Sequence, residues 1–196
     1  MPIDYFVDET FNAPANAGKR PFYALAVVGV DRADLKQLRL ELGQMFAGQR
    51  WHSSEILSRK FGRNRFMNLA SQVGMKLNLK IFLVYPISIA DRTGERSRKA
   101  LLKAVAQEVA KKSPQSFITF ERRSGGLHSR DVETLAEIAA DGFRHCRLWS
   151  PADERLLWLP DTLATAYRHL FLYQDRTLIE SFQQEVIIRK ISSKVV

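Results

Sequence analysis

The sequence has few of the features that mark secreted or membrane proteins. Cys146 is the only cysteine, so no disulfide can form within the chain, as is typical of the reducing cytosol. No run of about 18 apolar residues is present, and the first four residues lack the basic and apolar segments of a signal peptide. We therefore expect a cytoplasmic protein without a transmembrane helix, in which Cys146 is a strand residue rather than a nucleophile.

Acidic residues are also in deficit. The chain of 196 residues has 30 Lys and Arg against 21 Asp and Glu, which gives a formal charge of +9. A basic balance favours a polyanionic partner, and nucleic acid, RNA or DNA, is favoured over an acidic membrane, so we expect no membrane partner. The alternative is a basic surface that only keeps the protein in solution. A homo-oligomer or a protein partner is left open.

A buried strand is predicted close to the N-terminus, at Ile3–Asn12. Side chains alternate along a strand, so Tyr5 points to one face while Phe6 and Asp8 point to the other. The strand is apolar on both faces, as a central strand of a covered sheet would be, but it ends on Asp8 and Glu9. Burying a charge costs several kcal/mol unless it is paired or binds a metal. The alternative is a strand that enters a polar loop, with Asp8 solvated.

The remaining pattern alternates between strands and helices. Periodicity and turn residues predict strands at 22–30, 77–87, 116–122 and 143–149, and a last strand or an ordered tail at 185–191. They predict helices at 35–47, 97–112 and 130–142 and through most of 153–173, with a further helical segment at 176–182. An antiparallel hairpin followed by parallel crossovers predicts an α/β fold with a mixed sheet flanked by helices.

A helical basic segment interrupts this alternation. Ser53 or Ser54 is predicted to cap a helix with Glu55 in its first turn, and Gly62 to break or bend that helix. We therefore expect one domain over residues 1–196 with a helical basic insertion at about 31–75. Its basic side chains, together with two arginines at the end of the strand predicted at 116–122, could contact a phosphate backbone or lie on a solvated face. The six candidates are Arg59, Lys60, Arg63, Arg65, Arg122 and Arg123.

Three acids occupy positions where an unpaired charge is unexpected. Asp8 and Glu121 end predicted strands, and Asp161 lies on an otherwise apolar helix face. If the three converge at one side of the sheet, a divalent cation would relieve their repulsion, and Mg²⁺ and Mn²⁺ prefer such ligands. Two such ions can activate a water and stabilise the leaving oxygen in phosphodiester cleavage. The alternative for each acid is a helix cap or a surface salt bridge.

These residues resemble a known family. The order of a first strand ending in Asp, a later strand ending in an acid and an Asp on a late helix is similar to the ribonuclease H-like superfamily. Tyr-Phe-Val-Asp-Glu-Thr near the start, His-Ser-Ser-Glu at 52–55 and Leu-Pro-Asp-Thr-Leu-Ala at 159–164 resemble motifs of the bacterial family called domain of unknown function 3800. The resemblance covers residues 3–173 and implies a ribonuclease H-like fold and a nuclease-like activity.

The resemblance also implies roles for single residues. Asp8 and Asp161 would be metal ligands, and Glu121 would stand where the superfamily more often has Asp. Glu55 is our choice for the remaining catalytic acid, with Glu9 behind it as a metal ligand. His52 would be a neighbouring group or a proton carrier, or alternatively a histidine packed beside Trp51.

Two functions follow from this reading. The first is a nuclease that depends on Mg²⁺ or Mn²⁺ and hydrolyses the phosphodiester bonds of RNA, DNA or a hybrid. The second is a module with the same fold that binds nucleic acid or a protein without cleavage, for instance as a subunit of a defence or mobile-element complex.

Overall fold

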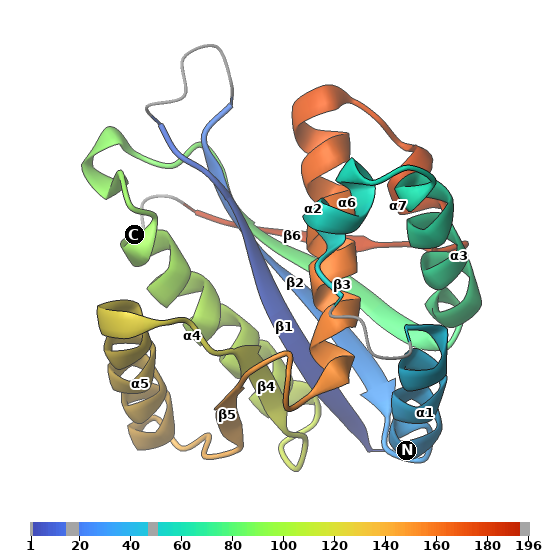
Figure 1. Cartoon of the computed structure of the whole chain (residues 1–196). Coiled ribbons are helices and arrows are strands. Elements are labelled where there is room, and N and C mark those ends of the chain that lie inside the picture. The colour runs from blue at the N-terminus through green and yellow to red at the C-terminus, as the bar shows by residue number, and fades with distance from the viewer. Residues whose placement is uncertain (1, 15–19, 47–50, 193–196) are drawn as a thin grey trace.

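The sheet of the protein lies between two layers of helices (Figure 1). The computed structural model describes residues 2–14, 20–46 and 51–192. The sheet has six strands in the order β5-β4-β1-β2-β3-β6. The strands are β1 (Ile3–Asn12), β2 (Phe22–Asp31), β3 (Leu77–Val84), β4 (Ile118–Glu121), β5 (Cys146–Trp149) and β6 (Ile187–Ile191).

The strand directions confirm a mixed α/β sheet. β1, β2 and β3 pair antiparallel in succession, whereas β4 pairs parallel with β1, β5 with β4, and β6 with β3. The predicted hairpin is therefore formed by β1 and β2. Residues 15–19, at the tip of this hairpin, lie outside the described part of the chain.

Helices cover both faces of the sheet. The chain forms α1 (Leu35–Met45), α2 (Ser53–Ser58), α3 (Gly62–Gly74), α4 (Glu95–Lys112), α5 (Gly125–Ala140), α6 (Trp158–Tyr173) and α7 (Thr177–Glu180). One face carries α4 and α5, and the other carries the remaining helices, with α6 lying across β1 and β2 (Figure 1). No helix in the described ranges is long and apolar enough to cross a membrane.

The alternation predicted for the first strand is confirmed. Tyr5 and Val7 belong to the core under α4 and α5, whereas Phe6 belongs to the core under α6. Asp8, two residues after Phe6, therefore points toward α6. Cys146 is the first residue of β5, and burial raises the pKa of its thiol to about 12, which fits a strand residue and not a nucleophile.

Several predicted boundaries are wrong. The helix predicted at 130–142 is α5, which already begins at Gly125, so it is longer at its start than its pattern suggests. The helix expected from Ser53 onward is two helices, α2 and α3, separated at Phe61, whose backbone is left-handed. The residue at the α2 N-cap is His52 instead of Ser53 or Ser54. The predicted insertion at about 31–75 contains α1, α2 and α3.

We predict that alanine substitutions at two glycines change the stability of the protein in opposite directions, because one glycine is closely packed and the other lies in open space. A Cβ on Gly74, at the end of α3, would meet the backbone carbonyl of Phe182, whereas a Cβ on Gly126 meets nothing within 4 Å. Gly74→Ala should lower the free energy of unfolding by about 2 kcal/mol because backbone must move. Gly126→Ala should raise it by about 0.5 kcal/mol. Urea unfolding measures both, and equal stability of the two variants would contradict this packing.

Candidate functional site

Two carboxyl groups lie side by side on the sheet face that α6 covers. β1 and β4 are parallel, and their register pairs Val7 with Phe120. Phe120 belongs to the core under α4, so the next residues, Asp8 and Glu121, both point to the opposite face. Their side chains share a hydrogen bond, which requires one of the two carboxyls to hold a proton.

The third carboxyl comes from the first turn of α6. Pro160 is compatible with this turn because the first residues of a helix need no N–H partner within it. Asp161, which follows it, accepts two hydrogen bonds at Oδ2, from the backbone N–H of Ser53 at 2.8 Å and from its hydroxyl at 2.9 Å. The Ser53 hydroxyl in turn accepts a bond of 2.9 Å from the indole N–H of Trp51. The start of α2 thus fixes Asp161 and leaves Oδ1 outside these bonds.

Each of the three acids has a raised pKa, and burial is the largest cause in every case. Burial first, and then the charges of Glu121, Glu9 and Asp161, hold the pKa of Asp8 well above its usual range. Burial and the charges of Glu9 and Asp161 raise the pKa of Glu121 to about 7. Burial also raises the pKa of Asp161, against the two hydrogen bonds from Ser53. Asp8, Glu121 and Asp161, named here the acidic trio, therefore form one electrostatic unit.

Among the residues that the structure describes, the acidic trio has no cationic partner, unlike three of the four most buried acids; the fourth, Asp91, is held by Ser97 and by backbone N–H groups at the start of α4. Asp4, Asp131 and Glu154 each form an ion pair with an arginine at 2.6–2.9 Å. Within residues 2–14, 20–46 and 51–192, no Lys or Arg forms an ion pair with any member of the trio. The fold therefore collects negative charge at this point and leaves it uncompensated.

Glu9 lies near the trio but is held from the opposite face of the sheet. It forms an ion pair of 2.5 Å with Arg98 of α4, whose side chain is only 2% exposed. The same guanidinium makes two bonds to Asp131, at 2.8 and 2.9 Å, and Asp131 is also bound by Arg123. Glu9 was predicted as a metal ligand, and the structure shows its carboxylate already engaged by this buried arginine.

His52 and Glu55, the two candidates from the 52–55 segment, are both exposed but have different charged neighbours. The charge of His52 opposes the rise in the pKa of Glu121 and of Asp161, so His52 lies beside the trio. Its Nδ1 is 3.0 Å from the Ser54 hydroxyl, and its side chain is exposed rather than packed. Glu55 is exposed as well and has a loose ion pair of 3.8 Å with Arg59.

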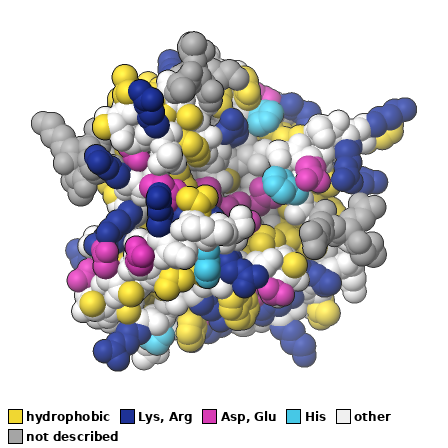
Figure 2. All heavy atoms as spheres, turned by 60° about the vertical axis from the view of Figure 1, so that its left-hand side comes forward, with side chains coloured by type: hydrophobic (Ala, Val, Ile, Leu, Met, Phe, Trp, Pro, Cys, Tyr) yellow, Lys and Arg dark blue, Asp and Glu magenta, His cyan; other side chains and the backbone are white. Residues whose placement is uncertain are grey.

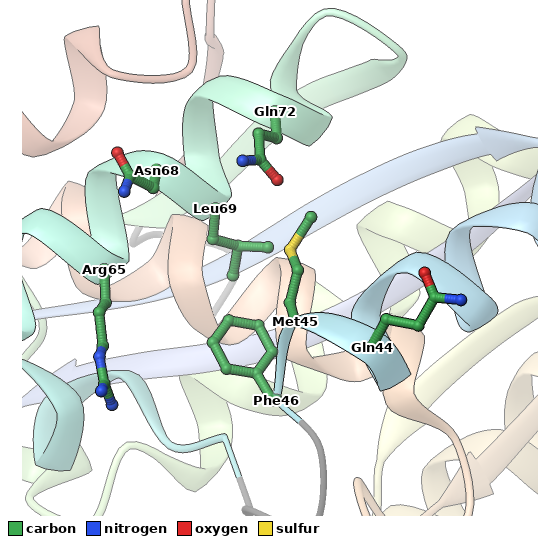
Figure 3. A pocket seen from close by; sticks show the side chains of 7 residues that line it. All are labelled: Gln44, Met45, Phe46, Arg65, Asn68, Leu69 and Gln72. Atoms are coloured by element: carbon green, nitrogen blue, oxygen red, sulfur yellow. The ribbon is translucent and has the colours of Figure 1, made fainter.

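The six basic candidates do not form one uniform surface. Arg63 is paired with Asp175 at 2.8 Å, and Arg123 is bound by Glu95 and Asp131 with its side chain mostly buried. Arg65 points into a surface cavity of about 400 Å³ between α1 and α3 that also contains Asn68, Gln72 and Gln44 (Figure 3). All the candidates except Arg123 are exposed: Arg59, Lys60, Arg63, Arg65 and Arg122.

The shape and charge of this side of the molecule suit a charged ligand. Figure 2 shows Asp and Glu side chains gathered in a hollow, with Lys, Arg and His side chains around it. A second cavity, of about 480 Å³, borders His52 and Glu55 and extends to Trp158, at the start of α6, and to the loop 150–152. The three acids of the trio are themselves half-buried, so they are only partly screened from solvent.

The donor atoms of the trio fit a hard divalent cation. Mg²⁺ and Mn²⁺ bind carboxylate oxygens, and a cation would replace the proton that Asp8 and Glu121 share. In the described part of the chain, no three His, Cys, Asp or Glu side chains already surround one metal position. A cation would thus require these carboxyls to turn from one another toward it.

Sequence reasoning missed two residues that position the acids. Ser53 was taken for a helix cap, and its bond to Asp161 spans 108 positions of sequence. Arg98 was not singled out, since nothing local distinguishes it from the other basic residues of its helix. Burial of a charged side chain between two acids is the signal that identifies Arg98, and only the structure contains it.

The fold is similar to that of ribonucleases H of type 2. No family model and no curated protein matches the sequence. RNase HII from Archaeoglobus fulgidus, solved as a complex with PCNA, aligns with a TM-score of 0.52 and 17% identity over 94% of this chain and 79% of that chain.

Two further solved structures align more weakly. Bst-RNase HIII in complex with Mn²⁺ has a TM-score of 0.48 and 12% identity, over 87% of this chain and 52% of that chain. The present chain thus spans about half the length of that protein. Ribonuclease H2 from Pyrococcus horikoshii OT3 has a TM-score of 0.47 and 12% identity, over 88% of this chain and 74% of that chain.

These comparisons bear on the fold alone. The match to RNase HII and the mixed sheet agree with the resemblance found in the sequence. Membership of the domain of unknown function 3800 family stays a prediction, since no family model supports it. The chain has a ribonuclease H-like fold.

Proposed function

We propose that this protein is a nuclease that depends on a divalent cation and hydrolyses phosphodiester bonds of RNA, DNA or a hybrid. The observation that carries the proposal is the acidic trio without a Lys or Arg partner in the described chain, at the junction of β1, β4 and α6. The net charge of +9 supports a polyanionic substrate. The likeness in fold to a protein named RNase HII supports the same class of activity.

The trio would hold the cation, and the surrounding residues would keep the trio in place. When bound, Mg²⁺ or Mn²⁺ supplies an activated water and neutralises charge on the phosphate. Ser53 donates two hydrogen bonds to Oδ2 of Asp161, so Oδ1 is the oxygen left for the cation. His52, exposed beside Asp161, would carry a proton between the site and solvent. Glu55 and Glu9 are secondary candidates.

A binding module is the second candidate, and one observation favours it. Asp8 and Glu121 bond to each other rather than diverging around a metal position. A site that stays in this arrangement would bind nucleic acid at its basic border without cleaving it. Metal-dependent cleavage separates the two functions.

We expect the wild-type protein to cleave at least one of single-stranded RNA, single-stranded DNA or a hybrid with Mn²⁺ or Mg²⁺, and EDTA to abolish cleavage. Asp8→Asn removes a ligand and should reduce the rate by about a hundredfold or more. Without metal, the variant should melt about 3 °C higher than wild type because an amide can donate a hydrogen bond to Glu121 without first taking up a proton. Gel assays and calorimetry measure these effects.

The matched control for this charge removal is Asp141→Asn. Asp141 is exposed at the end of α5 and belongs to no ion pair found in the described chain. It should leave cleavage and melting unchanged. Cleavage by Asp8→Asn at the wild-type rate, or a wild type that neither gains stability from Mn²⁺ nor cleaves, would contradict the nuclease.

We predict that stability without metal falls as the pH rises. Glu121 has a pKa of about 7 in the folded protein, whereas a free glutamate titrates near 4.3. Between about pH 4.5 and 7 the folded state therefore binds more protons than the unfolded state, and the free energy of unfolding decreases with pH. Asp8 also has a raised pKa in the folded protein, so Asp8→Asn removes its share of this proton binding and should flatten the decrease. Urea unfolding at pH 5 and 7.5 in EDTA tests it; parallel curves would be inconsistent with coupled acids.

Two adjacent arginines should show opposite effects. Arg122 is exposed, so Arg122→Ala should weaken nucleic-acid binding and reduce the salt slope by about one, with unchanged melting. Arg123 is bound by Glu95 and Asp131, so Arg123→Ala should cost about 3 kcal/mol of stability. Binding titrations at several salt concentrations and urea unfolding distinguish them. An Arg122→Ala variant with unaltered affinity and salt slope would place this side chain outside the interface.

A further inference from the structure

One corner of the sheet, next to the acidic trio, presents an exposed tryptophan and a half-buried arginine. On the face of Glu121, β4 and the residue before it contribute Thr119 and Phe117, and β5 contributes Arg147 and Trp149. The parallel register pairs Thr119 with Arg147 and Glu121 with Trp149. Neighbouring strands are about 4.8 Å apart, so the backbone of Trp149 is one strand from Glu121 and two from Asp8.

Trp149 is the exposed tryptophan of the protein. Its exposed fraction is 38%, against 4% for Trp51 and 7% for Trp158, and these three are all the tryptophans of the chain. The guanidinium carbon of Arg147 lies 4.1 Å from the centre of its ring. One face of the indole is therefore covered by a cation, and its exposed surface lies on the remainder of the ring.

Arg147 is oriented but not neutralised. Its Nε donates a hydrogen bond of 2.7 Å to the Thr119 hydroxyl, and its guanidinium also lies over the ring of Phe117 at 5.2 Å. No Asp or Glu of the described ranges forms an ion pair with it. The Trp149 ring and the Thr119 hydroxyl thus orient the side chain, and neither contact uses its terminal amino groups. Asp4 and Glu154, whose charges act on Arg147, are each paired with another arginine.

We propose that Trp149 and Arg147 form a stacking platform for an unpaired base of the strand held at the acidic trio, with Arg147 contacting a phosphate beside it. This inference rests on the proposed function and names its substrate class as a strand with a single-stranded segment. An exposed indole stacks on a base face, and that face is free only where the base is not already stacked in a duplex. The arginine behind the ring adds cation–π attraction and the charge that a nucleotide needs.

The test measures binding in EDTA, so that it does not depend on cleavage. Labelled 12-nucleotide single-stranded RNA and DNA, and duplexes of the same sequence, are titrated with wild type, Trp149→Ala, Trp149→Phe and Phe117→Ala. Phe117 is the matched control because it has the same exposure, 38%, and the same arginine neighbour, but lies four residues before Glu121. Melting temperatures show that each variant is folded.

Trp149→Ala should weaken single-stranded binding about tenfold, Trp149→Phe by much less, and Phe117→Ala by no more than about twofold. Duplex binding should change little in all three. Single-stranded oligonucleotides should also quench the tryptophan emission of wild type but not of Trp149→Phe, since the other two tryptophans are buried.

The platform is overturned if Trp149→Ala binds single strands as wild type does, if it loses duplex and single-stranded binding equally, or if wild type binds none of these oligonucleotides. The same experiments distinguish failure of the platform from failure of the proposed nuclease. Binding that depends on Trp149 without metal-dependent cleavage retains the platform and rejects the nuclease, while cleavage unaffected by Trp149→Ala rejects the platform and retains the nuclease.

Discussion

Repulsion among Asp8, Glu121 and Asp161 is the constraint around which this structure is arranged. Like charges in a partly buried site disfavour one another's ionisation, and the pKa of Asp8 and of Glu121 rises accordingly. The fold supplies no arginine or lysine to compensate them within the residues described. It relies instead on a shared proton between two neighbouring strands and on two hydrogen bonds from Ser53 to the third acid. Such an arrangement costs stability and is retained where a ligand makes use of it.

On the other face of the sheet, buried acids are paired with buried arginines. Arg98 and Arg123 together surround Asp131, and Arg98 extends to Glu9, which is the residue after Asp8. Buried ion pairs contribute little net stability, but removing one partner is strongly destabilising, so they fix geometry more than they add stability. This network ties β1 to α4 and α5 on one face of the sheet. The backbone at Asp8 is thereby held from the face opposite to the trio.

The sequence predicted the strands and helices best where a single periodicity applies to many residues. The alternation of Tyr5, Phe6 and Val7 predicted the facing of Asp8 correctly because a period of two belongs to any strand. The start of α5 was missed because Gly125 and Gly126 are poor helix formers, and the helix begins there in spite of its local sequence. The break between α2 and α3 was suspected at Gly62 but lies at Phe61, whose left-handed backbone is rare for a bulky residue. In both cases the intrinsic preference of the residue placed the boundary wrongly.

The sequence by itself determined the class of the sheet, the facing of Asp8 and the residue types that could bind a cation, because these depend on periodicity and on side-chain chemistry. Only the tertiary structure decided which groups meet. Ser53 reaches Asp161 across 108 positions, Arg98 reaches Glu9 across 89, and Trp149 stands beside Glu121 through strand pairing. It also decided that Arg123 is bound by two acids while Arg122, next to it, stays exposed. The sequence shows which residues are charged but not which residues they pair with, because the pairs form between segments that are far apart in the sequence.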